Sequence, residues 1–130
     1  MNILILDDDE NRHQIFDKIY KNHNVTHVHG FASCIEALKQ GDWDLVHLDH
    51  DLGIEVENPD MKVDGWGRAV EYTGLDVVRW LADRLDYDLV KKIIVHSMNP
   101  PGGFRMYGEL ADAGFDVTYA PFDKNYLRKP

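Results

Sequence analysis

The chain has 130 residues, of which 44% are hydrophobic, so it can bury the core of one domain, residues 1–130, and is not a disordered segment. Its 23 acidic and 14 basic residues give a formal charge of −9, which repels a nucleic-acid backbone and argues against a duplex-binding protein. The apolar runs are too short to span a bilayer, so we expect no association with a membrane. Cys34 is the single cysteine, which rules out a disulfide within the chain and fits a reducing compartment, so we expect a cytoplasmic protein.

Apolar runs and amphipathic segments alternate along the chain. In chain order, the pattern predicts a strand at residues 3–6, a helix at 11–22, a strand at 25–29, a helix at 33–41, a strand at 44–48, a helix at 73–85, a strand at 91–95, a helix at 104–114 and a strand at 116–122. Capping-box spacings at Ser33 with Glu36 and at Thr73 with Asp76 predict where two of the helices begin.

The segment at residues 53–72 has no periodicity and is rich in turn-forming residues. Loops of this length inside a small domain are uncommon and are often functional, so we interpret it as a lid.

Strict alternation of strands and helices predicts an α/β protein with a parallel sheet and right-handed crossovers. We expect a flavodoxin-like, three-layer sandwich with a five-stranded sheet in the order 2-1-3-4-5. Only eight residues follow the last strand, so the final helix is expected to be missing or very short.

Polar side chains follow three strands that this order makes neighbours. Acidic residues 7–9 follow the first strand, residues 49–51 (Asp-His-Asp) follow the third, and His96 follows the fourth. Carboxylates brought together at one sheet edge repel each other unless a cation relieves them. Asp8, Asp49 and Asp51 offer the oxygen ligands that Mg²⁺, Mn²⁺ and Ca²⁺ prefer, and Mg²⁺ is the expected ion.

Simpler interpretations stand beside this one. One acid of residues 7–9 can cap the following helix, and residues 49–51 can be a solvated strand end. His96 can be a buried core histidine, which is the favoured interpretation for His47. His27 and His29 receive no role.

The positions of Asp7, Asp8, Asp49 and Ser97 resemble those of the response-regulator receiver domain over nearly the whole chain. The resemblance implies that Asp7 joins Asp8 and Asp49 as a metal ligand, that Asp49 is the phosphoacceptor and that Ser97 is the switch hydroxyl. The chain departs from that family where a lysine is usual before Pro121.

The sequence is more similar to the cyclic-phosphate-processing receiver domains, a receiver-derived group. The similar blocks are residues 6–8 with Arg12, residues 48–53 (Leu-Asp-His-Asp-Leu-Gly), residues 73–80, and residues 95–100 (Val-His-Ser-Met-Asn-Pro) with Gly102 or Gly103 and Met106 beyond. Four blocks in the right order make the signal specific.

This similarity implies a metal-dependent phosphoesterase-like activity on a cyclic phosphate. We interpret His50 and His96 as general base and acid beside Asp49. The expected phosphate-binding groups are the side chains of Ser97, Asn99 and Arg12 and the N–H groups of Thr73 and Gly74.

The expected partner is a small phosphorylated compound derived from a nucleotide. A terminal 2′,3′-cyclic phosphate, an ADP-ribose 1″,2″-cyclic phosphate and a cyclic nucleotide all stay open as substrates.

Two other functions are consistent with the sequence. One is a signalling receiver that takes a phosphoryl group on Asp49, and the other is a non-catalytic pseudo-receiver that acts as a binding module. A missing final helix would expose apolar surface, so a homodimer is consistent with any of the three.

Overall fold

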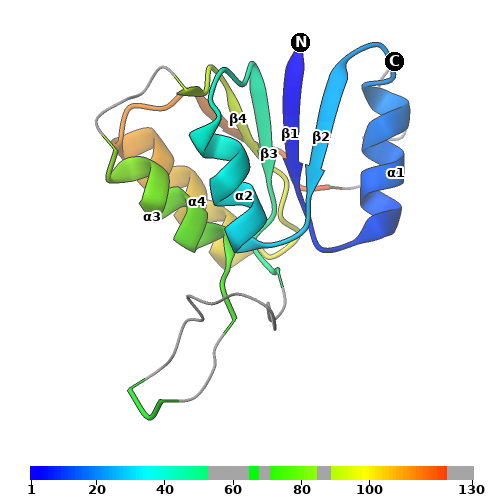
Figure 1. The fold of residues 1–130 in the computed structure, drawn as a ribbon. Coiled ribbons are helices and arrows are strands. Elements are labelled where there is room, and N and C mark those ends of the chain that lie inside the picture. The colour runs from blue at the N-terminus through cyan, green and yellow to red at the C-terminus, as the bar shows by residue number, and fades with distance from the viewer. Residues whose placement is uncertain (53–64, 68–70, 85–88, 123–130) are drawn as a thin grey trace.

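The short apolar runs form five parallel strands in one sheet with the order β2-β1-β3-β4-β5. The computed structural model describes residues 1–52, 65–67, 71–84 and 89–122. The elements are β1 (Asn2–Leu6), α1 (Glu10–Ile19), β2 (Asn24–Val28), α2 (Phe31–Lys39), β3 (Leu45–Leu48), α3 (Gly74–Ala82), β4 (Ile93–Val95), α4 (Pro100–Asp112) and β5 (Val117–Tyr119). Figure 1 shows the arrangement, which confirms the predicted α/β sandwich and strand order.

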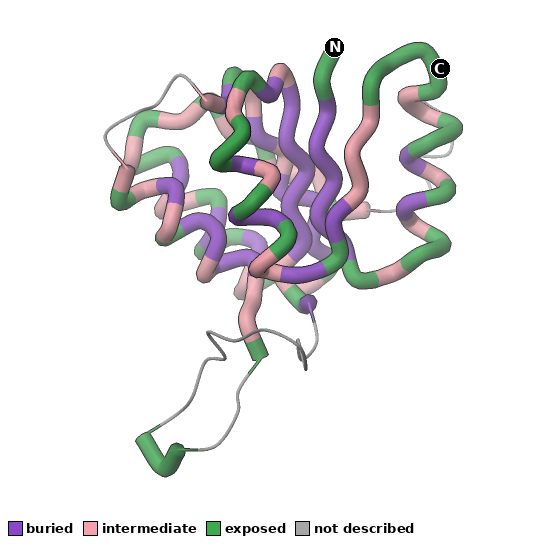
Figure 2. Tube along the Cα trace, viewed as in Figure 1, coloured by how far each residue is buried: buried purple, intermediate pink, exposed green. Residues whose placement is uncertain are grey.

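The helices cover the two faces of the sheet unequally. Figure 1 shows α1 on one face and α2, α3 and α4 on the other. The side of the three helices holds the larger apolar cluster, which includes Leu4, Leu6, Leu38, Val46 and Leu110. The α1 side holds a smaller one, made of Ile3, Ile5, Phe16 and Leu45. Figure 2 shows that burial is concentrated in the central strands between them.

Strand register places histidines on the α1 side. Ile5 pairs with His27 of β2 and with His47 of β3. Paired positions in neighbouring parallel strands share a face, so both histidines lie on the face of Ile5. His47 is fully buried and its Nε2 lies 2.6 Å from the Tyr20 hydroxyl, which confirms its interpretation as a core residue.

Side-chain caps fix where three helices begin. The Asp9 carboxylate accepts a hydrogen bond from the Arg12 N–H at the start of α1, so one of the three acids is indeed a cap. The Asn99 side chain accepts from the Gly102 N–H at the start of α4. Thr73 caps α3 as predicted, and its N–H donates to the Asp76 carboxylate.

Two predicted helix starts are wrong. Helix α2 begins at Phe31 with Gly30 as its N-cap, and Ser33 contributes from the third position, where its hydroxyl accepts from the Gly30 N–H. Helix α4 begins at Pro100, earlier than Phe104, because proline suits the first turn of a helix, where its missing N–H has no partner to lose.

Several predictions fall outside the described residues. The lid covers residues 53–72, of which only 65–67, 71 and 72 are described, and the question of a final helix concerns residues 123–130. Within the described part of the chain, no helix is both long enough and apolar enough to cross a membrane.

Candidate functional site

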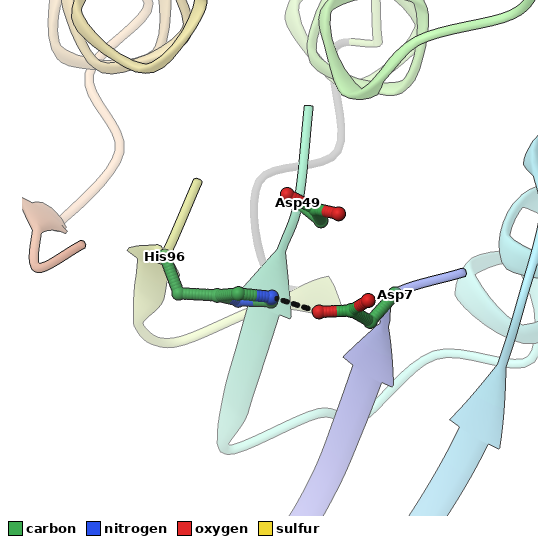
Figure 3. Close-up of side chains that lie close together, drawn as sticks. All are labelled: Asp7, Asp49 and His96. Carbon is green, nitrogen blue, oxygen red and sulfur yellow. Dashed lines mark hydrogen bonds and ion pairs between the residues drawn. The ribbon is translucent and has the colours of Figure 1, made fainter. Parts of the chain in front are cut away.

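The carboxyl ends of three neighbouring strands bring acidic and imidazole side chains together. Asp7 follows β1, Asp49 follows β3 and His96 follows β4. One ligand atom from each lies within 4.8 Å of the other two, and all three residues are buried. Figure 3 shows the His96 ring directed at the Asp7 carboxylate, with Asp49 beside them. Residues far apart in the sequence therefore meet at one edge of the sheet.

Asp7 is the hub of this cluster. Its Oδ2 accepts hydrogen bonds from Arg12 Nε at 2.7 Å and from His96 Nε2 at 2.8 Å. Its Oδ1 accepts from Arg12 Nη2 and from the Asp9 N–H, each at 2.8 Å. Burial alone would raise the pKa of Asp7, but the bonds from His96 and Arg12 outweigh burial and hold that pKa well below its usual range. Asp7 is therefore a carboxylate whose oxygens are already fully used.

Arg12 contacts the other carboxylates more loosely. Its Nη2 lies 3.5 Å from Asp8 Oδ1 and 3.5 Å from Asp49 Oδ2. Burial and the nearby Asp7 raise the pKa of Asp49 to about 7, and the same two causes raise the pKa of Asp8. One guanidinium thus leaves part of the carboxylate repulsion unrelieved.

A cavity of about 190 Å³ opens beside these groups. It is lined by Arg12, Asp49, Asp51, His96, Met98 and Asn99. Its wall combines the guanidinium of Arg12 with two carboxylates and an amide, which suits a small polar ligand. A negatively charged ligand would need a further cation beside the carboxylates.

His50 lies between a carboxylate and the first turn of α4. His50 Nδ1 lies 2.8 Å from Asp51 Oδ1 and 3.4 Å from the amide nitrogen of Asn99. The carboxylate can only accept, so the proton stands on Nδ1 and the lone pair stands on Nε2. A Cβ atom at Gly102 would lie 2.6–2.8 Å from the His50 ring, so glycine at that position leaves room for the imidazole.

His96 is held differently from His50. Its side chain is 1% exposed and its Nε2–H donates to Asp7, while its Nδ1 has no hydrogen-bond partner among the described residues. Burial lowers the pKa of His96 against the opposing effect of Asp7, so the ring is neutral. In this structure His96 therefore fixes the Asp7 carboxylate by a hydrogen bond, and neither of its ring nitrogens is exposed to solvent.

The predicted phosphate-binding groups are near the site but are partly engaged. The Ser97 hydroxyl is buried and accepts from the Asn99 N–H at 3.0 Å. The Gly74 N–H donates to the His50 carbonyl at 2.8 Å and the Thr73 N–H donates to Asp76, so neither amide is available to an anion in this structure. Gly74 has a packing role instead, since a Cβ there would lie 1.9 Å from the Asp49 carbonyl oxygen.

The donor set fits a divalent cation. Four carboxylates, those of Asp7, Asp8, Asp9 and Asp49, lie within 4 Å of one guanidinium. Burial first, and then repulsion from Asp7, raise the pKa of Asp49, and a nearby cation would offset both effects. Asp49 Oδ1 accepts a hydrogen bond from the His50 N–H at 2.9 Å, while Asp49 Oδ2 and Asp8 Oδ1 have loose contacts with Arg12 at 3.5 Å. Both oxygens of Asp7, by contrast, accept two short hydrogen bonds each. Asp51 lies on the cavity wall with its side chain 66% exposed. Asp49 belongs to the close group that it forms with Asp7 and His96, and Asp8 and Asp51 are flanking carboxylates that could contribute further oxygens to an ion.

Sequence reasoning missed three features of the site. The contact of Arg12 with the whole carboxylate group and the bond between His96 and Asp7 depend on tertiary geometry, and no sequence spacing encodes them. Met98, which lines the cavity and is 63% exposed, lies in a block similar to the family but received no role from the sequence. Gly102 did give one, because a glycine in the first turn of a helix marks a close approach.

A parallel sheet in this order, with acids behind its central strands, defines a receiver fold. The chain matches the family described as Cyclic-phosphate processing Receiver domain over residues 2–112, and it belongs to that family.

Solved structures of receiver domains have the same fold. A CheY-like response regulator receiver domain from Methylobacillus flagellatus gives a TM-score of 0.64 at 17% identity, covering 99% of this chain and 91% of that chain. A response regulator from Burkholderia pseudomallei, described with a phosphorylated aspartic acid, a calcium ion and citrate, gives a TM-score of 0.64 at 17% identity, with 98% and 64% covered. These likenesses concern the fold alone. No curated protein matches this chain.

Proposed function

We propose that this chain is a metal-dependent phosphoesterase that opens a cyclic phosphate on a nucleotide or an RNA end. The observation that carries the proposal is the cavity in which Arg12, Asp49 and Asn99 meet, with the His50–Asp51 pair beside it. Membership of a family described as processing cyclic phosphates supports the substrate class. The overall negative charge makes a local cation necessary for any phosphate ligand.

His50 is the proposed general base. Asp51 holds its Nδ1–H, so Nε2 is left as the acceptor that can take a proton from an attacking water. A carboxylate behind an imidazole also stabilises the imidazolium that forms when the proton is taken. The side chain of His50 is 16% exposed, so the ring is largely buried beside the cavity and keeps some contact with solvent.

Arg12 and the carboxylates set the electrostatics of phosphate binding. Burial does not remove the charge of Arg12, because hydrogen bonds to Asp7 raise its pKa further. When bound by Asp49, Asp8 and Asp51, a divalent cation supplies the charge that neutralises phosphate oxygens and the leaving oxygen. Asn99 can donate from its amide to a non-bridging oxygen, since its carbonyl oxygen is used in capping α4.

His96 is proposed as a positioning residue in place of a general acid. Its hydrogen bond to Asp7 fixes the carboxylate that in turn orients Arg12 through two further bonds. Loss of His96 would therefore weaken phosphate binding through Arg12, and would do so without removing the base.

The test is ³¹P NMR of the three candidate substrate classes with the wild type, with Mg²⁺ or with chelator. We expect one class to show ring opening that needs the metal, and we expect His50→Ala to reduce the rate about 10²–10⁴-fold, the usual contribution of a general base. His23→Ala, a surface histidine outside the site, is the control and should retain full turnover. Equal rates in His50→Ala and wild type would refute the base assignment.

A phosphoacceptor role for Asp49 is the second candidate, favoured by the position of Asp49 at the end of β3 in a receiver fold. Acetyl phosphate with Mg²⁺ would then add one phosphoryl group, visible by mass spectrometry, and Asp49→Asn would abolish the addition. If Asp49 is phosphorylated and the protein turns over none of the cyclic phosphates, the phosphoacceptor role is favoured over the phosphoesterase.

A further inference from the structure

A second group of histidines lies away from the acidic cavity, between α1 and the edge strand β2. His13 lies in α1, His27 lies in β2, and His29 directly follows the end of β2. The His13 and His27 rings have their Nδ1 atoms 2.5 Å apart, and the His13 and His29 ring centroids are 4.2 Å apart. None of these three residues takes part in the phosphate chemistry proposed above.

The outer nitrogen of each ring faces an oxygen atom. His13 Nε2 lies 2.7 Å from the Asp7 carbonyl oxygen, His27 Nε2 lies 2.6 Å from Asp17 Oδ1, and His29 Nε2 lies 2.9 Å from Glu10 Oε2. Carbonyl and carboxylate oxygens only accept, so each Nε2 must carry the hydrogen. In the neutral imidazole the lone pair then stands on Nδ1.

This assignment makes the short contact between His13 and His27 repulsive unless something positive lies in it. With both rings in this form, two acceptor nitrogens lie 2.5 Å apart, and a ring that turned its N–H inward would lose its hydrogen bond to oxygen. A cation between the two nitrogens satisfies both at once. Imidazoles whose second nitrogen donates to a carboxylate or a carbonyl are the usual arrangement around a bound transition metal.

We propose that His13 and His27, with His29 beside them, bind a borderline transition-metal ion of the Zn²⁺ class. Neutral imidazole nitrogens suit Zn²⁺, Co²⁺ and Ni²⁺, whereas the oxygen-rich cavity suits Mg²⁺. Zn–N bonds of about 2.0–2.1 Å at tetrahedral angles put two ligand nitrogens about 3.4 Å apart, so binding opens the His13–His27 contact by about 1 Å.

Burial grades the three ligands. His13 is 1% exposed, whereas the side chains of His27 and His29 are 24% and 52% exposed, so the ion would enter from the β2 edge. Among the described residues, the group with three ligand atoms close together is the one at Asp7. At the histidine group only the two Nδ1 atoms of His13 and His27 already lie close together, so His29 and water would fill the other coordination positions of the ion. The ion would tie α1 to β2, and His13 would link it to the Asp7 backbone.

The experiment is titration of Zn²⁺, by calorimetry, and of Co²⁺, by visible absorption, in excess Mg²⁺ so that the acidic cavity is occupied. Wild type should bind one ion, with the absorption of nitrogen-ligated Co²⁺ and a metal-dependent rise in Tm. We expect His27→Gln to weaken binding at least about 10-fold and His29→Gln to weaken it less. His23→Gln and Asp49→Asn are the controls and should bind as the wild type does.

Three outcomes would overturn the proposal. Absence of saturable Zn²⁺ binding would mean that a shared proton satisfies the pair. Binding lost in Asp49→Asn but kept in His27→Gln would place the ion in the acidic cavity, and binding lost in His23→Gln would place it at the surface. Circular dichroism of each variant shows whether it is folded, and His29→Gln, at an exposed position, keeps the test valid if His27→Gln does not fold.

Discussion

The face of the sheet under α2, α3 and α4 buries aliphatic side chains, whereas the α1 side buries three histidines, His13, His47 and His96. The rings of His47 and His96 lie 4.7 and 5.2 Å from that of Phe16. Apolar burial stabilises wherever it occurs, but a buried imidazole stabilises only if its nitrogens find partners. The face under α2, α3 and α4 thus stabilises the fold by apolar burial. The α1 face buries polar groups whose role depends on their hydrogen-bond partners.

Asp7 and Asp49 repeat this contrast within the site. Asp7 is saturated with hydrogen bonds and stays ionised, so it contributes to stability. Asp49 is buried with few partners and resists ionisation, so it costs stability whenever it is charged. Groups that destabilise a fold at rest are frequent at functional sites, because a ligand can relieve them.

The largest expected loss of stability comes from Asp7→Ala. Removing one partner from a buried ion pair costs about 3–5 kcal/mol, since Arg12 and His96 lose their acceptor. The lowered pKa of Asp7 also predicts acid sensitivity in the wild type: the stability is present above the unfolded pKa near 3.9 and is lost as the pH falls below it. Urea unfolding between pH 3 and 7 measures both effects, and an unchanged midpoint in Asp7→Ala would contradict a stabilising role for the Asp7 carboxylate.

On the aliphatic face, Leu110→Ala should cost about 2–5 kcal/mol, because a fully buried side chain leaves a cavity. The loss should be the same at every pH from 5 to 8, because what the substitution removes is apolar packing within a cluster of hydrophobic side chains. Tyr107→Ala, at a partly exposed position in the same helix, should cost much less. Urea unfolding of both variants across this range provides the measurement, and a pH-dependent loss in Leu110→Ala would show that the faces are not separate.

Asp49→Asn is expected to stabilise the metal-free protein. The folded state keeps a proton on Asp49 up to a pKa of about 7, whereas the unfolded state loses it near 3.9. The contribution of Asp49 to the stability of the wild type therefore falls as the pH rises from 4 to 7, by at most about 4 kcal/mol, and is level above pH 7.

The variant lacks this slope, so thermal unfolding in chelator should show its advantage at pH 8 and almost none at pH 4. A variant less stable than wild type at pH 8 would contradict the account of strain at Asp49.

The smallest change is Gly102→Ala, which places a methyl group against the His50 ring. Displacing a catalytic ring by about 1 Å can reduce turnover about 10²-fold, so we expect low activity with normal unfolding. Gly108→Ala, in the same helix but in open space, is the control and should stabilise α4 by up to about 1 kcal/mol without changing turnover. Equal turnover in the two variants would mean that the His50 position is not used.

Sequence reasoning predicted the sheet because strands in a parallel sheet are nearly continuous apolar runs, as at residues 3–6 and 44–48. It placed Asp49 and His96 at one edge because strand order decides which strand ends are neighbours. It erred where local signals compete. Ser33 has a cap residue's chemistry, but Gly30 takes that position, and the proline at position 100 starts α4 before its apolar stripe begins.

Contacts between side chains were beyond the sequence. The direction of Arg12, toward Asp7 rather than toward a ligand, depends on distances that no spacing gives. The same is true of His96, whose strand-end position fits a core residue and a catalytic residue equally until its partner is known.

Calorimetric titration of Mg²⁺ or Mn²⁺ into the metal-free protein tests most directly whether the strand ends form one cation-dependent site. We expect a single saturable ion in wild type, binding at least about 10-fold weaker in Asp49→Asn, and no change in Asp112→Asn, which removes a carboxylate at the far end of α4. Equal binding in wild type and Asp49→Asn would contradict the account.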